Sequence, residues 1–213
     1  MIIKNIHYIG SIPSVPKREM ILLRLGYKKN TTTLSEEQEK FLESGIRSAL
    51  SLCRLSGVYG RFAIVERSES HIKLENGKKF ESASLAKLLS NSDEVMLMAS
   101  TAGKTIVDRI RSEVSTGNAA LGVIMDSTAS QAADAALGWL MEFINKTIRR
   151  EGCKLTKHRY SPGYGDLLLI NQKIIYDMLE LSKYGVELTE KYMLVPEKSV
   201  LAIAGIERIE AYE

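Results

Sequence analysis

Cysteine is scarce in this chain of 213 residues, and that scarcity excludes two kinds of site. Cys53 and Cys153 lie far apart and neither has a cysteine neighbour, so no disulfide framework and no C-x-x-C metal site can be written. Each is predicted to be a small buried apolar residue. The histidines, His7, His71 and His158, are isolated from one another and from carboxylates at ligand spacing, so no metal site is predicted.

Long hydrophobic runs and an excess of one charge are also lacking. No stretch approaches the roughly 20 apolar residues of a membrane span, and the segment 1–10 is too short and interrupted for a signal peptide. We therefore expect a cytoplasmic protein that does not enter a membrane. The 29 basic and 26 acidic residues nearly balance along the chain, which argues against a nucleic-acid partner.

The common signatures of nucleotide binding and hydrolysis are absent too. Neither G-x-G-x-x-G nor G-x-S-x-G occurs, and no catalytic residue is predicted. The segment 99–105 resembles a phosphate-binding loop, but Met98 stands where that loop needs its first glycine. We interpret it as a strand-to-helix turn with Lys104 in solvent.

What is present is the composition of an ordinary globular protein, with 45% hydrophobic and 26% charged residues. We expect a single domain over residues 1–213. Ser35 and Gln38 form a predicted capping box at the start of one helix. Apolar periodicity predicts helices at 15–25, 35–52, 82–89, 104–114, 118–150 and 171–183. Strands are predicted at 58–66, 71–74, 94–100, 191–194 and 200–206. This order indicates an α+β fold with a mixed, largely antiparallel sheet flanked by helices.

One loop carries the residues best suited to a ligand, Arg159-Tyr-Ser-Pro-Gly-Tyr-Gly-Asp166. Pro162 sets the entry to a turn, and Gly163 and Gly165 can adopt positive φ and let a ligand touch the backbone. Arg159 can clamp a carboxylate with its planar guanidinium, and Tyr164 offers an aromatic face. The residues alone also fit a second interpretation, in which this loop is a Pro-Gly turn between two secondary-structure elements and binds no ligand.

The spacing Arg159-x-x-x-Gly163-Tyr164 resembles the Arg-x-x-x-Gly-Tyr motif of the activation domain of cobalamin-dependent methionine synthase, which binds S-adenosylmethionine there. The segment 185–200 resembles that domain's G-x-x-L-T-E…P-x-x-S-V stretch and follows at a comparable distance. The resemblance covers about residues 118–206, whereas residues 1–117 show no clear resemblance and receive no role.

The resemblance implies a binding site for S-adenosylmethionine made by Asp134, Arg159, Tyr160, Pro162, Gly163, Tyr164 and Gly165. Tyr160 would contribute mainly backbone contacts to the adenosine portion. Asp134 stands where the family has an acidic residue near the ligand's amino group, and an exposed helix carboxylate is the alternative. The sequence Pro-Gly-Tyr-Gly-Asp departs from the usual Pro-Gly-Tyr-Pro and is more similar to free-standing members of the family.

The function implied is that of a stand-alone reactivation module that supports reductive methylation of inactive cob(II)alamin. Because the chain has no D-x-H-x-x-G segment, the cobalamin is expected on a partner, the cobalamin-binding domain of a separate methionine synthase. Flavodoxin or another electron donor is a further implied partner. Two alternatives stay open: an activator of another corrinoid methyltransferase system, and a non-catalytic sensing or interaction module. Whether the chain is itself an enzyme, and its oligomeric state, are left undecided.

Overall fold

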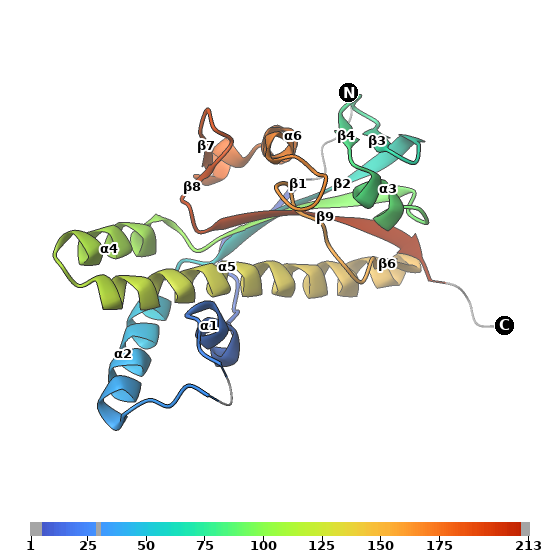
Figure 1. Cartoon of the computed structure of the whole chain (residues 1–213). Helices are drawn as coiled ribbons and strands as arrows, with labels where there is room; N and C mark the ends of the chain where they lie inside the picture. The colour runs from blue at the N-terminus through green and yellow to red at the C-terminus, as the bar shows by residue number, and fades with distance from the viewer. Residues whose placement is uncertain (1–5, 29–30, 210–213) are drawn as a thin grey trace.

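An antiparallel sheet forms the centre of the protein in a computed structural model that describes residues 6–28 and 31–209 (Figure 1). The seven described strands run in the order β4-β3-β2-β5-β9-β6, and β1 pairs with β2. Their bounds are β1 Ile6–Ile9, β2 Ser56–Arg67, β3 His71–Leu74, β4 Lys79–Glu81, β5 Glu94–Thr101, β6 Cys153–Leu155 and β9 Ser199–Arg208. A separate two-stranded ladder joins β7 Glu187–Leu188 to β8 Leu194–Val195.

Helices cover both faces of this sheet, which confirms the predicted α+β class. The helices are α1 Arg18–Arg24, α2 Glu36–Leu52, α3 Ala83–Leu88, α4 Lys104–Ser115, α5 Ala119–Ile148 and α6 Gln172–Met178. Short 3-10 turns lie at η1 Arg149–Glu151, η2 Leu169–Asn171 and η3 Leu181–Tyr184. In Figure 1, α5 runs along one face of the sheet with α1, α2 and α4 beside it, and α3, α6 and the β7–β8 ladder lie on the other face.

The long helix α5 packs against the sheet through its predicted apolar stripe. Leu137, Leu140 and Ile144 are almost fully buried and share a core cluster with Met96 and Met98 of β5. Burying each such side chain contributes about 1.5–3 kcal/mol. Nearer its N-terminus, most buried positions of α5 are alanines and other small residues, with Ile124 and Met125 as large exceptions, and α2 and α4 pack against it there.

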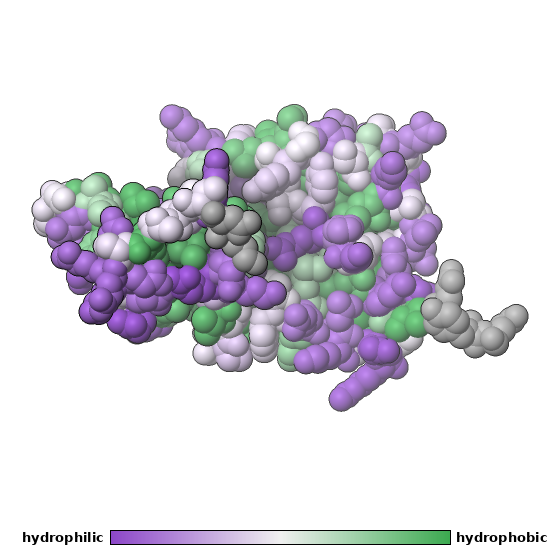
Figure 2. Space-filling model, turned by 60° about the horizontal axis from the view of Figure 1, so that its bottom comes forward, coloured by the Kyte–Doolittle hydropathy of each residue, from purple (hydrophilic) through white to green (hydrophobic). Residues whose placement is uncertain are grey.

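The start of α2 confirms the predicted capping box. The Ser35 hydroxyl accepts a hydrogen bond from the Gln38 amide at 3.2 Å, and the Gln38 side chain accepts one from the Ser35 amide at 2.9 Å. Figure 2 shows the face that carries α1 and α2, where hydrophilic side chains dominate and smaller hydrophobic patches lie between them. Met20, Leu23 and Phe41 are among the exposed hydrophobic residues of these two helices.

Several boundaries differ from the sequence predictions, and each has a local cause. The helix predicted over 15–25 begins at Arg18, after Pro16. The strand predicted over 191–194 is mostly a turn, because Tyr192 has a positive φ of 59°, and only Leu194 enters β8. The helix predicted over 171–183 divides into α6 and the 3-10 turn η3, because Glu180 also has a positive φ of 52°. The strands β1, β4, β6 and β7 were not predicted.

The residues first considered for other chemistry have structural roles. Cys153 is buried as predicted, whereas Cys53 is only partly buried; desolvation nevertheless raises the pKa of the Cys53 thiol to about 11. Met98 is fully buried in the sheet, and Lys104 is exposed and pairs with Asp108 one turn later. Within the described ranges, no cluster of His, Cys, Asp and Glu could hold a metal ion, and no helix is long and apolar enough to cross a membrane.

Candidate functional site

The loop that follows Arg159 is held to the sheet by backbone hydrogen bonds. The Tyr160 amide donates to the Ile203 carbonyl at 2.9 Å, and the Ile203 amide donates back to the Tyr160 carbonyl at 2.8 Å. The Gly163 amide then donates to the Leu167 carbonyl at 2.7 Å, with Gly163 at a φ of +93° and Pro162 buried. Any ligand contact of the Tyr160 backbone is therefore limited to the second lone pair of its carbonyl.

The far end of the loop is anchored on the opposite side of the sheet. The Asp166 carboxylate accepts hydrogen bonds from the Ser82 hydroxyl at 2.6 Å and the Ser84 amide at 3.1 Å, at the start of α3. These two bonds lower the pKa of Asp166 to about 2, the Ser82 bond having the larger effect. A Cβ at Gly165, whose φ is +53°, would lie 2.1 Å from the Tyr160 hydroxyl oxygen, so glycine is required there.

Arg159 and Asp134 lie together, although they are 25 positions apart in the chain. The Arg159 Nη2 atom donates to the Asp134 carboxylate, and Nη1 donates to the Met141 sulfur at 3.7 Å. The Arg159 side chain is 26% exposed and that of Asp134 is 54% exposed. Asp134 is thus an exposed carboxylate on α5 that also faces the motif arginine.

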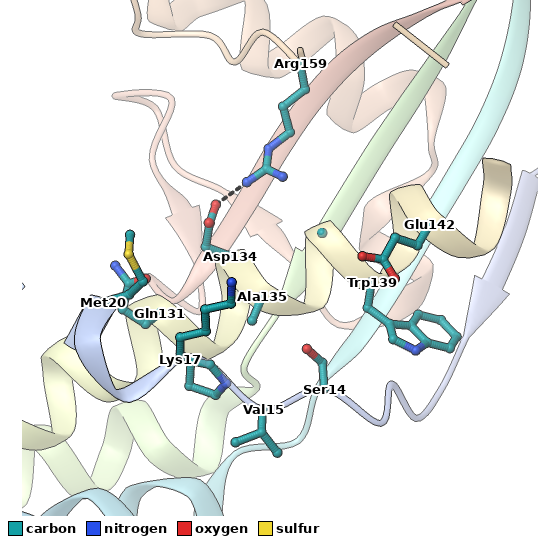
Figure 3. A pocket seen from close by; sticks show the side chains of 12 residues that line it. Ser14, Val15, Lys17, Met20, Gln131, Asp134, Ala135, Trp139, Glu142 and Arg159 are labelled. Carbon is teal, nitrogen blue, oxygen red and sulfur yellow. Dashed lines mark hydrogen bonds and ion pairs between the residues drawn. The ribbon is translucent and has the colours of Figure 1, made fainter. Parts of the chain in front are cut away.

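This ion pair lies in a hollow of about 340 Å³, which we name the Arg159 hollow (Figure 3). One side is the exposed stripe of α5, and the other is the segment that leads into α1. It is lined by Ser14, Val15, Pro16, Lys17, Met20, Gln131, Asp134, Ala135, Gly138, Trp139, Glu142 and Arg159.

A second hollow, the Tyr164 hollow, has a volume of about 370 Å³ and meets the first at Gln131 and Asp134. Its remaining lining residues are Arg24, Ser130, Ala133, Tyr164, Glu197, Lys198, Ser199 and Val200. The Lys198 ammonium forms an ion pair with Asp126 at 2.6 Å and donates to the Ser130 hydroxyl at 3.1 Å. The two segments that carry the family resemblance therefore meet at one hollow, through Tyr164 and residues 197–200.

Sequence reasoning found part of this site and missed part. Arg159 and Asp134 line the Arg159 hollow and Tyr164 lines the other, whereas Tyr160, Pro162, Gly163 and Gly165 shape the loop without lining either. The missed residues of α5 had a usable signal, because positions 131, 134, 135, 138 and 142 follow helical i, i+3/i+4 spacing. Nothing in the sequence indicated that residues 14–17 would form the opposite wall.

The chain was compared with protein families, curated proteins and solved structures. No family model matches the chain, and no curated protein matches it significantly. Among solved structures, the crystal structure of the MetH reactivation domain bound to AdoHcy superposes with a TM-score of 0.72. The match has 14% sequence identity and covers 98% of this chain and 80% of that one.

This chain has the fold of the MetH reactivation domain. The predicted resemblance is confirmed at the level of fold, from one end of the chain nearly to the other. The match therefore extends beyond residues 118–206 into the part that had shown no resemblance. The division at residue 118 and the ligand roles of the seven predicted site residues stay predictions.

Proposed function

We propose that this chain binds S-adenosylmethionine in the Arg159 hollow and acts as a reactivation module for a cobalamin-dependent methionine synthase on a separate chain. The observation that carries the proposal is the pairing of Arg159 with Asp134 at a ligand-sized hollow, in a chain with the reactivation-domain fold. A hollow of about 340 Å³ is within the usual range of roughly 300–1,000 Å³ for small-molecule sites.

The charges of the hollow fit the amino-acid end of this ligand. Its α-carboxylate matches the planar fork of Arg159, and its α-ammonium matches the carboxylate of Asp134. Because the two side chains already face each other, a zwitterion that enters the hollow can bind both at once. Two acidic side chains, Asp134 and Glu142, and two basic ones, Lys17 and Arg159, line the hollow, so it carries no net charge that would repel the positive sulfonium.

The chain's own task in this proposal is to bind and orient the ligand. Arg159 and Asp134 hold its amino-acid end, and the anchored loop keeps Arg159 in place. Bound there, S-adenosylmethionine would supply the methyl group for the reduced cobalt of a corrinoid held by the partner. Flavodoxin or a similar protein is the proposed source of the electron that reduces cob(II)alamin.

Binding is tested by calorimetry with S-adenosylmethionine on the wild type and Arg159→Ala. Loss of a charge-assisted bidentate interaction costs about 1.5–3 kcal/mol, so the dissociation constant should rise by roughly tenfold to a hundredfold. Arg150→Ala, an exposed arginine beyond the end of α5, serves as the matched control and should bind like the wild type. Absence of binding by the wild type would refute the proposal.

Reactivation is tested with an oxidised methionine synthase that lacks its own activation domain. Adding this chain, an electron donor and S-adenosylmethionine should restore methionine synthesis, and Arg159→Ala should restore it poorly. If the wild type binds the ligand but restores no activity, the chain serves another corrinoid protein or is a non-catalytic sensing module. Repeating the assay with other corrinoid methyltransferases then separates those two.

A further inference from the structure

The only tryptophan of the chain, Trp139, lies in the Arg159 hollow. Its indole stacks on the Phe143 ring, with centroids 5.4 Å apart and planes inclined by 10°. Phe143 in turn meets Tyr59 of β2 edge-on at 6.4 Å. The indole that lines the hollow is thus stacked on Phe143, and Tyr59 contacts Phe143 in turn.

The floor of the hollow is open between the ion pair and this tryptophan. Ala135 and Gly138 occupy the exposed stripe of α5 there, and a Cβ built on Gly138 would meet no atom within 4 Å. Trp139 follows Asp134 by five residues, which corresponds to about 7.5 Å along the helix axis. Figure 3 shows Asp134 and Ala135 between Met20 on one side and the indole on the other.

The tryptophan end of the hollow also carries a free hydrogen-bond acceptor. Glu142 lines the hollow three residues after Trp139, and no residue in 6–28 or 31–209 forms an ion pair or hydrogen bond with its carboxylate. The segment leading into α1 lines the same hollow, with Pro16 buried and Val15 74% exposed. The indole and one acceptor therefore lie together on the α5 side of the hollow.

We propose that Trp139 is the stacking platform for the purine base of the ligand, and that Glu142 accepts a hydrogen bond from the exocyclic amino group of adenine. The inference rests on the proposed function, which places the amino-acid end at Arg159 and Asp134. An aromatic ring stacks on a base because both have flat π-faces, and stacking alone does not distinguish one base from another. The acceptor at Glu142 then distinguishes adenine from bases that lack the amino group.

Tyr164 is the competing platform, and the geometry favours Trp139. Tyr164 is 72% exposed, and its hollow is lined mainly by polar and charged groups such as Glu197, Lys198 and Ser130. Trp139 instead shares a hollow with both members of the ion pair and is backed by Phe143. A ligand held by Arg159 can therefore reach the indole without leaving the Arg159 hollow.

Intrinsic fluorescence tests this directly, because all tryptophan emission comes from Trp139. Titration with S-adenosylmethionine should change the emission with the same dissociation constant that calorimetry measures on the same sample. Adenosine alone should also change it, and methionine alone should bind without the large change. Binding seen by calorimetry with unchanged emission would overturn the inference and leave the proposed function intact.

Substitutions give an independent measurement by calorimetry. Trp139→Leu should weaken S-adenosylmethionine binding by about fivefold to a hundredfold, Trp139→Phe should weaken it less, and Phe41→Leu on α2 should have no effect. Glu142→Gln should reduce the preference of the protein for S-adenosylhomocysteine over S-inosylhomocysteine, which lacks the amino group. Equal affinity of Trp139→Leu and wild type, with a Tyr164→Leu variant that binds weakly, would place the base in the Tyr164 hollow instead.

A failure of the proposed function is recognised separately. If calorimetry detects no S-adenosylmethionine binding by the wild type, both proposals fail. If binding depends on Arg159 but not on Trp139 or Glu142, only the assignment of the base fails. Thermal unfolding of each variant, compared with wild type, shows whether a lost signal reflects lost folding.

Discussion

Arg159 shows how much of a site can be inferred from single residues. An arginine before a glycine-rich turn suggested a carboxylate clamp, and the structure places it at a hollow beside an acidic partner. Trp139 could not be found the same way, because a lone tryptophan on a long helix is usually a core residue. Its proposed role depends on residues 14–17, which line the same hollow, and no local sequence pattern indicates that they lie there.

Replacing Asp134 by asparagine should distinguish the contribution of the ligand's ammonium group to binding from that of its carboxylate. Asp134→Asn removes the carboxylate that we assign to the ammonium group, so S-adenosylmethionine should bind about tenfold or more weakly. A ligand analogue without the amino group should bind the variant and the wild type alike. Calorimetry with both ligands checks this, and an equal loss for both would contradict the assignment.

Asp166 should make the stability of the protein sensitive to strong acid. Hydrogen bonds from Ser82 and Ser84 hold its folded-state pKa at about 2, below the ordinary value of 3.8. Its contribution is therefore fully present above about pH 4 and is lost as the pH falls through about 2. The free energy of unfolding of the wild type and Asp166→Asn, measured in urea from pH 7 to pH 2, should differ at neutral pH and converge in acid. A difference that persists at pH 2 would argue against this titration.

At the scale of elements, periodicity was most informative where a segment is long and packs through one face. The stripe of α5, the alternation of β2 and the continuous apolar run of β5 lie close to their predicted positions because each pattern extends over many residues. Whereas the 4-residue β3 was predicted from its place after β2, as the second strand of a hairpin, the strands β1, β4 and β6 have only 4, 3 and 3 residues and show no pattern of their own. They exist because a neighbouring strand supplies their hydrogen bonds, which is a tertiary effect.

The capping box of α2 provides a test at this scale. Ser35→Ala removes the hydroxyl that accepts the Gln38 amide, so the free energy of unfolding should fall by about 1 kcal/mol. Ser44→Ala, at an exposed position inside the same helix, is the matched control and should leave the free energy of unfolding unchanged or slightly higher, because alanine has the higher helix propensity. Urea denaturation of the two variants measures both values, and equal losses would show that the cap contributes nothing specific.

At the scale of the whole molecule, the part with sequence resemblance is not a structural unit by itself. β9 lies between β5 and β6, and α5 packs against α2 and α4. The strand β5 and both of those helices come from residues before 118. The first half of the chain therefore supplies the centre of the sheet, although its sequence carried no recognisable motif.

A fragment of residues 118–206 should consequently fail to fold cooperatively. It would retain the motif loop but lose β2 and β5, which leaves one long edge of β9 without hydrogen-bond partners and exposes the apolar face of α5. Urea unfolding followed by circular dichroism should show a broad, non-cooperative change, in contrast to the full chain. A sharp transition in the fragment would contradict this view of the fold.

The long helix α5 has a further consequence for how the proposed site can vary. One continuous helix carries Asp134, Gly138, Trp139 and Glu142, so the geometry of that helix fixes the angles and axial distances between these residues. One inserted residue between Asp134 and Trp139 would turn the indole by about 100° around the axis and shift it by about 1.5 Å. Insertions and deletions are thus tolerable in the turns around the hollow but not between Asp134 and Trp139. A related chain with a different number of residues in that interval would have to bind its ligand with different side chains.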